Sequence, residues 1–148
     1  ATALQQAMAG ISSEYAKSDV MASIKEMSAR VKQSEAPSKI LFLVSDMLEN
    51  SGVSSFYANR NVRVLNTNTE LQKATSADML ADLAGARVFV LGAGLVQDVN
   101  SKGAIKDSGI YRDPKTMAAL KAFWLQYFQR SDAKLQEFGM PALLVPVQ

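Results

Sequence analysis

Two short, uninterrupted apolar runs stand out in the pattern of hydrophobic and polar positions. One covers residues 40–44, Ile-Leu-Phe-Leu-Val, and in the other, residues 87–91, Val-Phe-Val-Leu follows Arg87. Neither run alternates with polar residues, and this pattern is typical of strands that are covered on both faces of a parallel sheet. Each run also follows a stretch with helical spacing. We therefore predict that the two runs form neighbouring parallel strands.

Apolar residues at helical spacing predict two helices before the first run, over residues 4–15 and 20–31. Ser18 is placed to cap the second helix, with Asp19 in its first turn. Pro37 disfavours helix at the residue before it, so the helical region ends there. The chain is thus expected to enter the first strand directly from a helix.

A helical pattern also precedes the second apolar run. A short strand is predicted over residues 62–65, and the capping-box spacing of Thr67 and Glu70 then opens a helix. A further helical piece is predicted over residues 77–84, with Gly85 as its left-handed C-terminal cap. Helix, glycine and buried strand in this order make one unit of a doubly wound α/β sheet.

The last third of the chain predicts a loop, a long helix and a final strand. Residues 95–113 have little periodicity and form a loop of functional length. Asp113 followed by proline is a strong helix start. The core-facing side of that helix carries Met117, Leu120, Phe123, Trp124, Tyr127 and Phe128. The last strand is expected within residues 135–145, where Pro141 suits an edge position.

The glycines after the second run resemble the start of a dinucleotide-binding fingerprint. Gly92 and Gly94 follow a strand, but the third glycine would fall at Gln97 and no helix clearly opens at Gly94. The fingerprint needs that full context. A tight strand exit is the better interpretation, and no nucleotide is expected.

Composition narrows the chemistry. The chain of 148 residues has no His and no Cys, which excludes a Ser-His-Asp triad, a cysteine nucleophile, a His-ligated zinc and a cysteine-bound cluster. The net charge is +2, with no run of like charges, so no nucleic-acid partner is expected. No apolar stretch approaches the roughly 18–20 residues that a membrane span needs. Carboxylate, hydroxyl and amide chemistry is what remains, and this favours a binding module over a hydrolase.

An acidic loop directly after the first run holds the candidate site. Asp46, Glu49 and Asn50 follow the strand, and parallel sheets bind ligands at the carboxyl ends of their strands. Their oxygen atoms suit a hard cation. The alternative is that Asp46 only caps the next turn, as Asp often does. The ligand-binding residues predicted here are Ser45, Glu49, Asn50, Ser51 and Gly94.

The strand that runs into residues 45–51 resembles the fourth strand and following loop of von Willebrand factor A-like domains. The exit at Gly92-Ala93-Gly94, the helix with Trp124 and Tyr127, and the end over residues 131–141 are similar to bacterial members. The family's Asp-x-Ser-x-Ser motif, which supplies most of the metal ligands, is absent. A periplasmic or secreted location is favoured over a cytoplasmic one.

The resemblance implies a Rossmann-like sheet, mostly parallel, with helices on both faces. It implies that Asp46 serves a divalent cation such as Mg²⁺, with the hydroxyl of Thr2 or Ser18 beside it. Residues 1–148 then form a single α/β domain or the C-terminal part of a longer one. Because a sheet without its central strands would expose apolar edges, we expect a further segment, a protein partner or a second copy in a homo-oligomer to cover them.

These observations favour a non-catalytic domain that recognises a protein or surface ligand at the carboxyl end of the sheet. Two alternatives stay open. One is a metal-assisted or carboxylate-based enzyme acting on a small polar substrate. The other is a scaffold whose site is vestigial.

Overall fold

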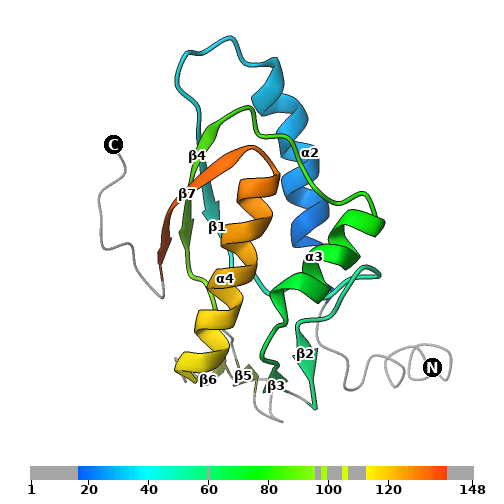
Figure 1. The fold of residues 1–148 in the computed structure, drawn as a ribbon. Coiled ribbons are helices and arrows are strands. Elements are labelled where there is room, and N and C mark those ends of the chain that lie inside the picture. The colour runs from blue at the N-terminus through cyan, green and yellow to red at the C-terminus, as the bar shows by residue number, and fades with distance from the viewer. Residues whose placement is uncertain (1–16, 60, 96–97, 100–104, 107–112, 140–148) are drawn as a thin grey trace, which may run out of the picture.

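A three-stranded parallel sheet with helices packed against it organises the computed structural model, which describes residues 17–59, 61–95, 98–99, 105–106 and 113–139 (Figure 1). In chain order the elements are α2 (Val20–Gln33), β1 (Ile40–Val44), β2 (Tyr57–Ala58), β3 (Asn61–Val62), α3 (Thr67–Ser76), β4 (Ala86–Leu91), β5 (Asp98–Val99), β6 (Ile105–Lys106), α4 (Pro114–Arg130) and β7 (Ala133–Gly139). The strand order in the sheet is β1-β4-β7, and β2–β3 and β5–β6 are short antiparallel pairs. The fold is therefore mixed α/β.

The two apolar runs form neighbouring parallel strands, which confirms the prediction. Ile40 of β1 lies beside Arg87 of β4, and the register continues without a break to Val44 and Leu91. β4 also pairs in parallel with β7, with one irregularity after Val88. Since β4 has a strand on each side, it is the centre of the sheet.

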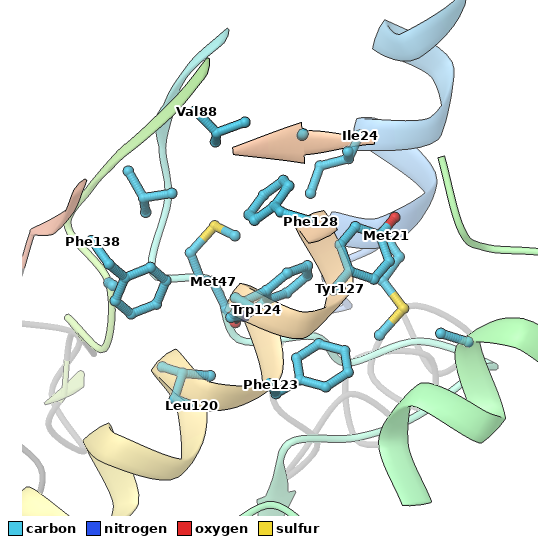
Figure 2. Packing of buried hydrophobic residues seen from close by; sticks show 14 of the residues in the cluster. Met21, Ile24, Met47, Val88, Leu120, Phe123, Trp124, Tyr127, Phe128 and Phe138 are labelled. Atoms are coloured by element: carbon cyan, nitrogen blue, oxygen red, sulfur yellow. The ribbon is translucent and has the colours of Figure 1, made fainter. Parts of the chain in front are cut away.

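The core lies between the sheet and the helices. The described helices lie on the same side of the sheet in Figure 1, and Leu41, Val88 and Val90 are buried. Figure 2 shows the aromatic face of α4 meeting this layer. The indole of Trp124 lies edge-on to Tyr127, with ring centroids 5.1 Å apart, and its N–H donates to the Met47 carbonyl at 2.9 Å. The predicted apolar face of the long helix is confirmed, because all six of its large residues are buried.

The outer face of β1 departs from the expectation. The run was predicted to be covered on both sides, but Ile40, Phe42 and Val44 are exposed by 44%, 45% and 73%, while Leu41 is buried. Although every residue of β1 is hydrophobic, burial alternates along the strand, so that one face is exposed and the other is covered. The prediction was correct for the strand and wrong for its surroundings.

Two of the three described helices begin differently from the prediction. Asp19, not Ser18, is the N-cap of α2, and it makes no side-chain capping hydrogen bond. In α3 the cap is Asn66, whose side chain accepts from the Thr69 N–H at 3.0 Å. The predicted capping box is wrong, because the carboxylate of Glu70 is held elsewhere. α4 starts as predicted, with Asp113 accepting from the N–H groups of its first turn.

The helical piece predicted over residues 77–84 is absent. That segment consists of two turns, at residues 77–78 and 84–85, joined by chain without regular secondary structure. The N–H groups of Ala81 and Leu83 donate instead to the side chain and carbonyl of Ser131, at 3.1 and 2.8 Å. Gly85 has the left-handed φ of 77° that was expected, but in the turn before β4.

Several predictions concern residues outside the described part of the chain. The first helix, residues 4–15, lies outside it, as do Thr2, most of the 95–113 loop and the last strand beyond Gly139. The strand predicted over 62–65 is shorter than expected, and it begins one residue earlier, as β3. None of the helices in the described ranges is long and apolar enough to cross a membrane.

Candidate functional site

The carboxyl ends of β1 and β4 meet at one edge of the sheet, as a parallel pair requires. There the Gly94 N–H donates to the Asp46 carbonyl at 2.7 Å. Gly92 and Gly94 have φ angles of 93° and 75°, which other residues rarely adopt. A Cβ on Gly94 would also collide with the Met117 side chain. The glycines therefore form a tight strand exit, as predicted, and bring Ser45, Asp46 and Gly94 together.

Asp46 occupies the turn directly after β1 and is half-buried. Its Oδ1 accepts from the Leu48 N–H at 2.9 Å, so the side chain caps this turn. The next residue, Met47, has a left-handed φ of 59°. Burial raises the pKa of Asp46, against the hydrogen bond from Leu48, which lowers it. The carboxylate of Asp46 forms no ion pair with any Lys or Arg in the described ranges.

Glu49 does not lie on the rim where it was expected. Its side chain is only 1% exposed, and Oε2 accepts from the Met21 N–H at 2.9 Å. The Val20 N–H and the Ser51 side chain also hydrogen-bond to it. Glu49 therefore caps α2 from a distant loop, in place of the cap that Asp19 does not provide. The positive end of the helix dipole favours a carboxylate at this position.

Burial is the main influence on the pKa of Glu49. Desolvation raises its pKa, and the hydrogen bonds from Ser51, Met21 and Val20 lower it less than burial raises it. The hydroxyl of Tyr127 lies near enough to sense this charge. Burial raises the pKa of Tyr127, and Glu49 raises it further.

The remaining predicted residues come to the same edge through their main chains. Ser18 and Asn50 exchange two backbone hydrogen bonds, at 3.0 and 2.9 Å. Ser51 turns the chain back, with its N–H donating to the Ser54 carbonyl. Ser18 therefore does lie beside the acidic loop, although these residues are 32 positions apart. Thr2 lies outside the described residues.

A groove of about 280 Å³ opens between the N-terminal half of α2 and the end of β1. Ser18, Asp19 and Ser45 supply polar groups to its lining, and Met27, Leu43 and Val44 are among its apolar residues. Sequence reasoning found Ser18 and Ser45 but missed the apolar residues, because a helical methionine is usually part of the core. Their exposure could be found only once the neighbouring faces of α2 and β1 were known.

The described residues do not form a metal centre by themselves. No group of three acidic, His or Cys side chains gathers anywhere in the described ranges, and Glu49 is turned to the helix. Asp46 and a hydroxyl would leave most positions around a Mg²⁺ ion to water. A cation here would need ligands from another segment or from a partner.

Comparisons of the chain with known protein families, with curated proteins and with solved structures found no match. The class that the structure defines is a mixed α/β domain with a parallel sheet. The likeness to von Willebrand factor A-like domains stays a prediction from the sequence.

Proposed function

We propose that this chain is a non-catalytic binding domain, Rossmann-like and von Willebrand factor A-like in type, that recognises a protein partner at the carboxyl end of its sheet. One observation carries the proposal. The described residues expose six large apolar side chains: Met27, Ile40, Phe42, Val44, Val64 and Leu95. All except Val64 lie on β1, in the groove beside it, or at the strand exit that β1 shares with β4.

This clustering supports a protein ligand for two physical reasons. Exposed apolar side chains that gather beside polar groups mark interaction sites, whereas scattered ones do not. Parallel strands are also usually covered on both faces, and β1 exposes three apolar residues on one of them. Asp46 and Ser18 supply polar contacts at the end of this surface. A divalent cation held by Asp46 would add to the binding if the partner completes its ligands.

An enzyme is the second candidate. A half-buried carboxylate with a raised pKa, unpaired within the described residues and beside a groove, is a feature of catalytic acids and bases. Asp46 meets that description, and a carboxylate-based reaction on a small polar substrate would use it. The absence of His and Cys from the chain limits the groups that could assist it. The third candidate, a scaffold with a vestigial site, would bind neither metal nor partner.

A peptide selection with matched variants tests the proposal. A phage library of random peptides is selected on the immobilised domain, and the enriched peptides are measured on two variants. Val44→Lys places a charge in the exposed cluster, and Val64→Lys places the same charge on the isolated exposed valine. We expect enriched peptides to lose at least tenfold in affinity for Val44→Lys and to keep their affinity for Val64→Lys.

The same peptides discriminate the alternatives. Equal affinity for both variants would refute the proposed surface. Loss of binding in EDTA, restored by Mg²⁺ and abolished by Asp46→Asn, would identify the metal. Turnover on a panel of hydrolase substrates that disappears in Asp46→Asn would instead favour the enzyme.

A further inference from the structure

A second cavity lies at the opposite, amino end of the sheet. It has a volume of about 390 Å³ and is lined where β1, β4 and β7 begin. Three of the lining residues are basic, namely Lys39, Arg87 and Lys134, and no carboxylate is among the described residues that line it. The cavity therefore concentrates positive charge in a protein whose net charge is only +2.

The strand register brings these charges together. Arg87 lies between Ile40 on one neighbouring strand and Lys134 on the other. Its N–H also donates to the Lys39 carbonyl at 3.0 Å. Neighbouring strands are about 4.8 Å apart, and paired positions share a face. Arg87 and Lys134 therefore start side by side, an arrangement that is destabilising for like charges.

No ion pair among the described residues neutralises the three cations of this cavity. Lys25, Lys32 and Arg63 each form an ion pair with a carboxylate, whereas Lys39, Arg87 and Lys134 form none with any described residue. Asp82 is close enough to sense Lys39, but its carboxylate already binds Lys32 at 2.9 Å. The repulsion among the three cations is thus left for solvent or a ligand to relieve.

Neutral hydrogen-bonding groups complete the cavity. The hydroxyl of Ser38 lies 3.4 Å from an Arg87 nitrogen, and Gln136 lines the wall beside Lys134. Gly85 contributes open space, since a Cβ there would meet no atom within 4 Å. Cations, a hydroxyl and an amide around an open space are the groups that bind a tetrahedral oxyanion.

We infer that this cavity binds a small molecule through a phosphate group. A guanidinium presents a planar fork that matches phosphate oxygens, and lysines add point charges. Three cations match a dianionic phosphate monoester better than a single carboxylate. The cavity volume falls within the roughly 300–1,000 Å³ of small-molecule sites. The site lies at the amino end of the sheet, whereas the surface proposed above runs along β1 from Ile40 to the carboxyl end. The inference does not depend on that proposal.

Calorimetric titration of the full chain with glycerol phosphate tests this inference. Sodium chloride at equal ionic strength and sodium acetate serve as control titrants. We expect saturable binding of glycerol phosphate and none of acetate. The double variant Lys39→Gln/Lys134→Gln should weaken binding at least tenfold. Lys121→Gln, which removes an exposed charge from α4, should leave it unchanged.

The Arg87→Lys variant distinguishes specific recognition of phosphate by the guanidinium from non-specific electrostatic attraction. It keeps the charge but removes the fork, so we expect weaker phosphate binding at an unchanged net charge. Circular dichroism checks that each variant is folded. If the double variant does not fold, Lys134→Gln alone replaces it, because Lys134 is exposed. Equal affinities for the wild type and the Lys134→Gln variant would overturn the inference. The inference would also be overturned if glycerol phosphate gave no more binding than the ionic-strength control. A parallel titration with vesicles that carry phosphatidic acid tests a lipid source of the phosphate, and binding to these vesicles alone would overturn the inference as well.

Discussion

Two buried glutamates in this domain have the same exposure and opposite electrostatics. Glu49 and Glu70 are each 1% exposed. Glu70 accepts from the Ser54 hydroxyl at 2.5 Å, from Arg63 at 2.6 Å and from Lys73 at 3.1 Å. Burial alone would raise the pKa of Glu70, but these hydrogen bonds and the charge of Arg63 outweigh it, so the pKa is lowered. Glu49 has only uncharged donors, and its pKa is raised.

The difference shows what a buried carboxylate needs in order to stay charged. Glu70 has two cations, which repay its desolvation, and it ties the β2–β3 hairpin to α3. Glu49 has only a helix N-terminus, whose partial positive charge offsets less of the desolvation cost of a carboxylate than a full cation does. Both carboxylates are buried and bound by donors of the protein itself, so an acidic residue in a candidate loop is not by that fact part of a site.

Removing Glu70 should have the largest effect on stability. In Glu70→Ala, Arg63 and the Ser54 hydroxyl lose their carboxylate within a partly buried cluster. We expect a loss of about 3 kcal/mol in the free energy of unfolding, measured by urea denaturation. Lys73→Ala is the matched control, because its exposed ammonium contributes little and its loss leaves the Arg63 pair intact. Equal losses in both variants would contradict the central role of Glu70.

Removing Glu49 should cost less, and the cost should depend on the replacement. Glu49→Ala leaves the first N–H groups of α2 without their acceptor, which should cost about 1–2 kcal/mol. Glu49→Gln keeps an acceptor and removes a disfavoured charge, so its stability should stay within about 1 kcal/mol of the wild type at pH 7. A larger loss in Gln than in Ala would show that the charge itself is required.

The two residues should also respond oppositely to pH. The lowered pKa of Glu70 means that its contribution is complete above the ordinary value of 4.5 and is lost as pH falls through the folded-state pKa. The raised pKa of Glu49 means that its contribution is complete below 4.5 and is lost as pH rises through its folded-state pKa. The free energy of unfolding should therefore be measured by urea denaturation from pH 3 to 8. We expect Glu49→Gln to remove a decrease in this free energy above pH 4.5, and Glu70→Gln to reduce its decrease toward acid pH.

Asp46 should give the smallest effect. Asp46→Asn keeps an oxygen for the Leu48 N–H and removes a charge whose pKa burial has raised, so the free energy of unfolding should change by less than about 1 kcal/mol. Any loss of partner or metal binding in this variant is then a loss of function and not of fold. A drop in melting temperature as large as that of Glu70→Ala would give Asp46 a structural role instead.

The sequence predicted the elements whose signals are local. The unbroken runs at β1 and β4 identified both strands and their pairing, and Asp113 before proline identified the start of α4. The helix expected over residues 77–84 does not form, because the N–H groups of Ala81 and Leu83 donate to Ser131. Helical spacing in the sequence contains no information about a partner so far along the chain. For the same reason Glu49 was placed on the rim, since its partner Met21 lies 28 residues away.

At the site, the sequence predicted which segments meet, but it did not predict that one face of β1 is exposed. Ser45, Asp46 and Gly94 come together because two parallel strands end at one edge, and that much follows from topology. The exposure of Ile40, Phe42 and Val44 did not follow, because a run of apolar residues contains no information about what lies above it. The basic cavity was missed because its three cations come from distant parts of the chain: Lys39 precedes β1, Arg87 lies on β4 and Lys134 lies on β7.

The bond between the indole of Trp124 and the Met47 carbonyl gives the protein a built-in optical reporter. Trp124 is the only tryptophan in the chain, and it is fully buried. Its hydrogen bond ends in the turn between Asp46 and Glu49, so a rearrangement of that turn changes the polarity around the indole. Intrinsic fluorescence should therefore follow events at the carboxyl end of the sheet without a label, and the opposite, basic end should leave the emission unchanged.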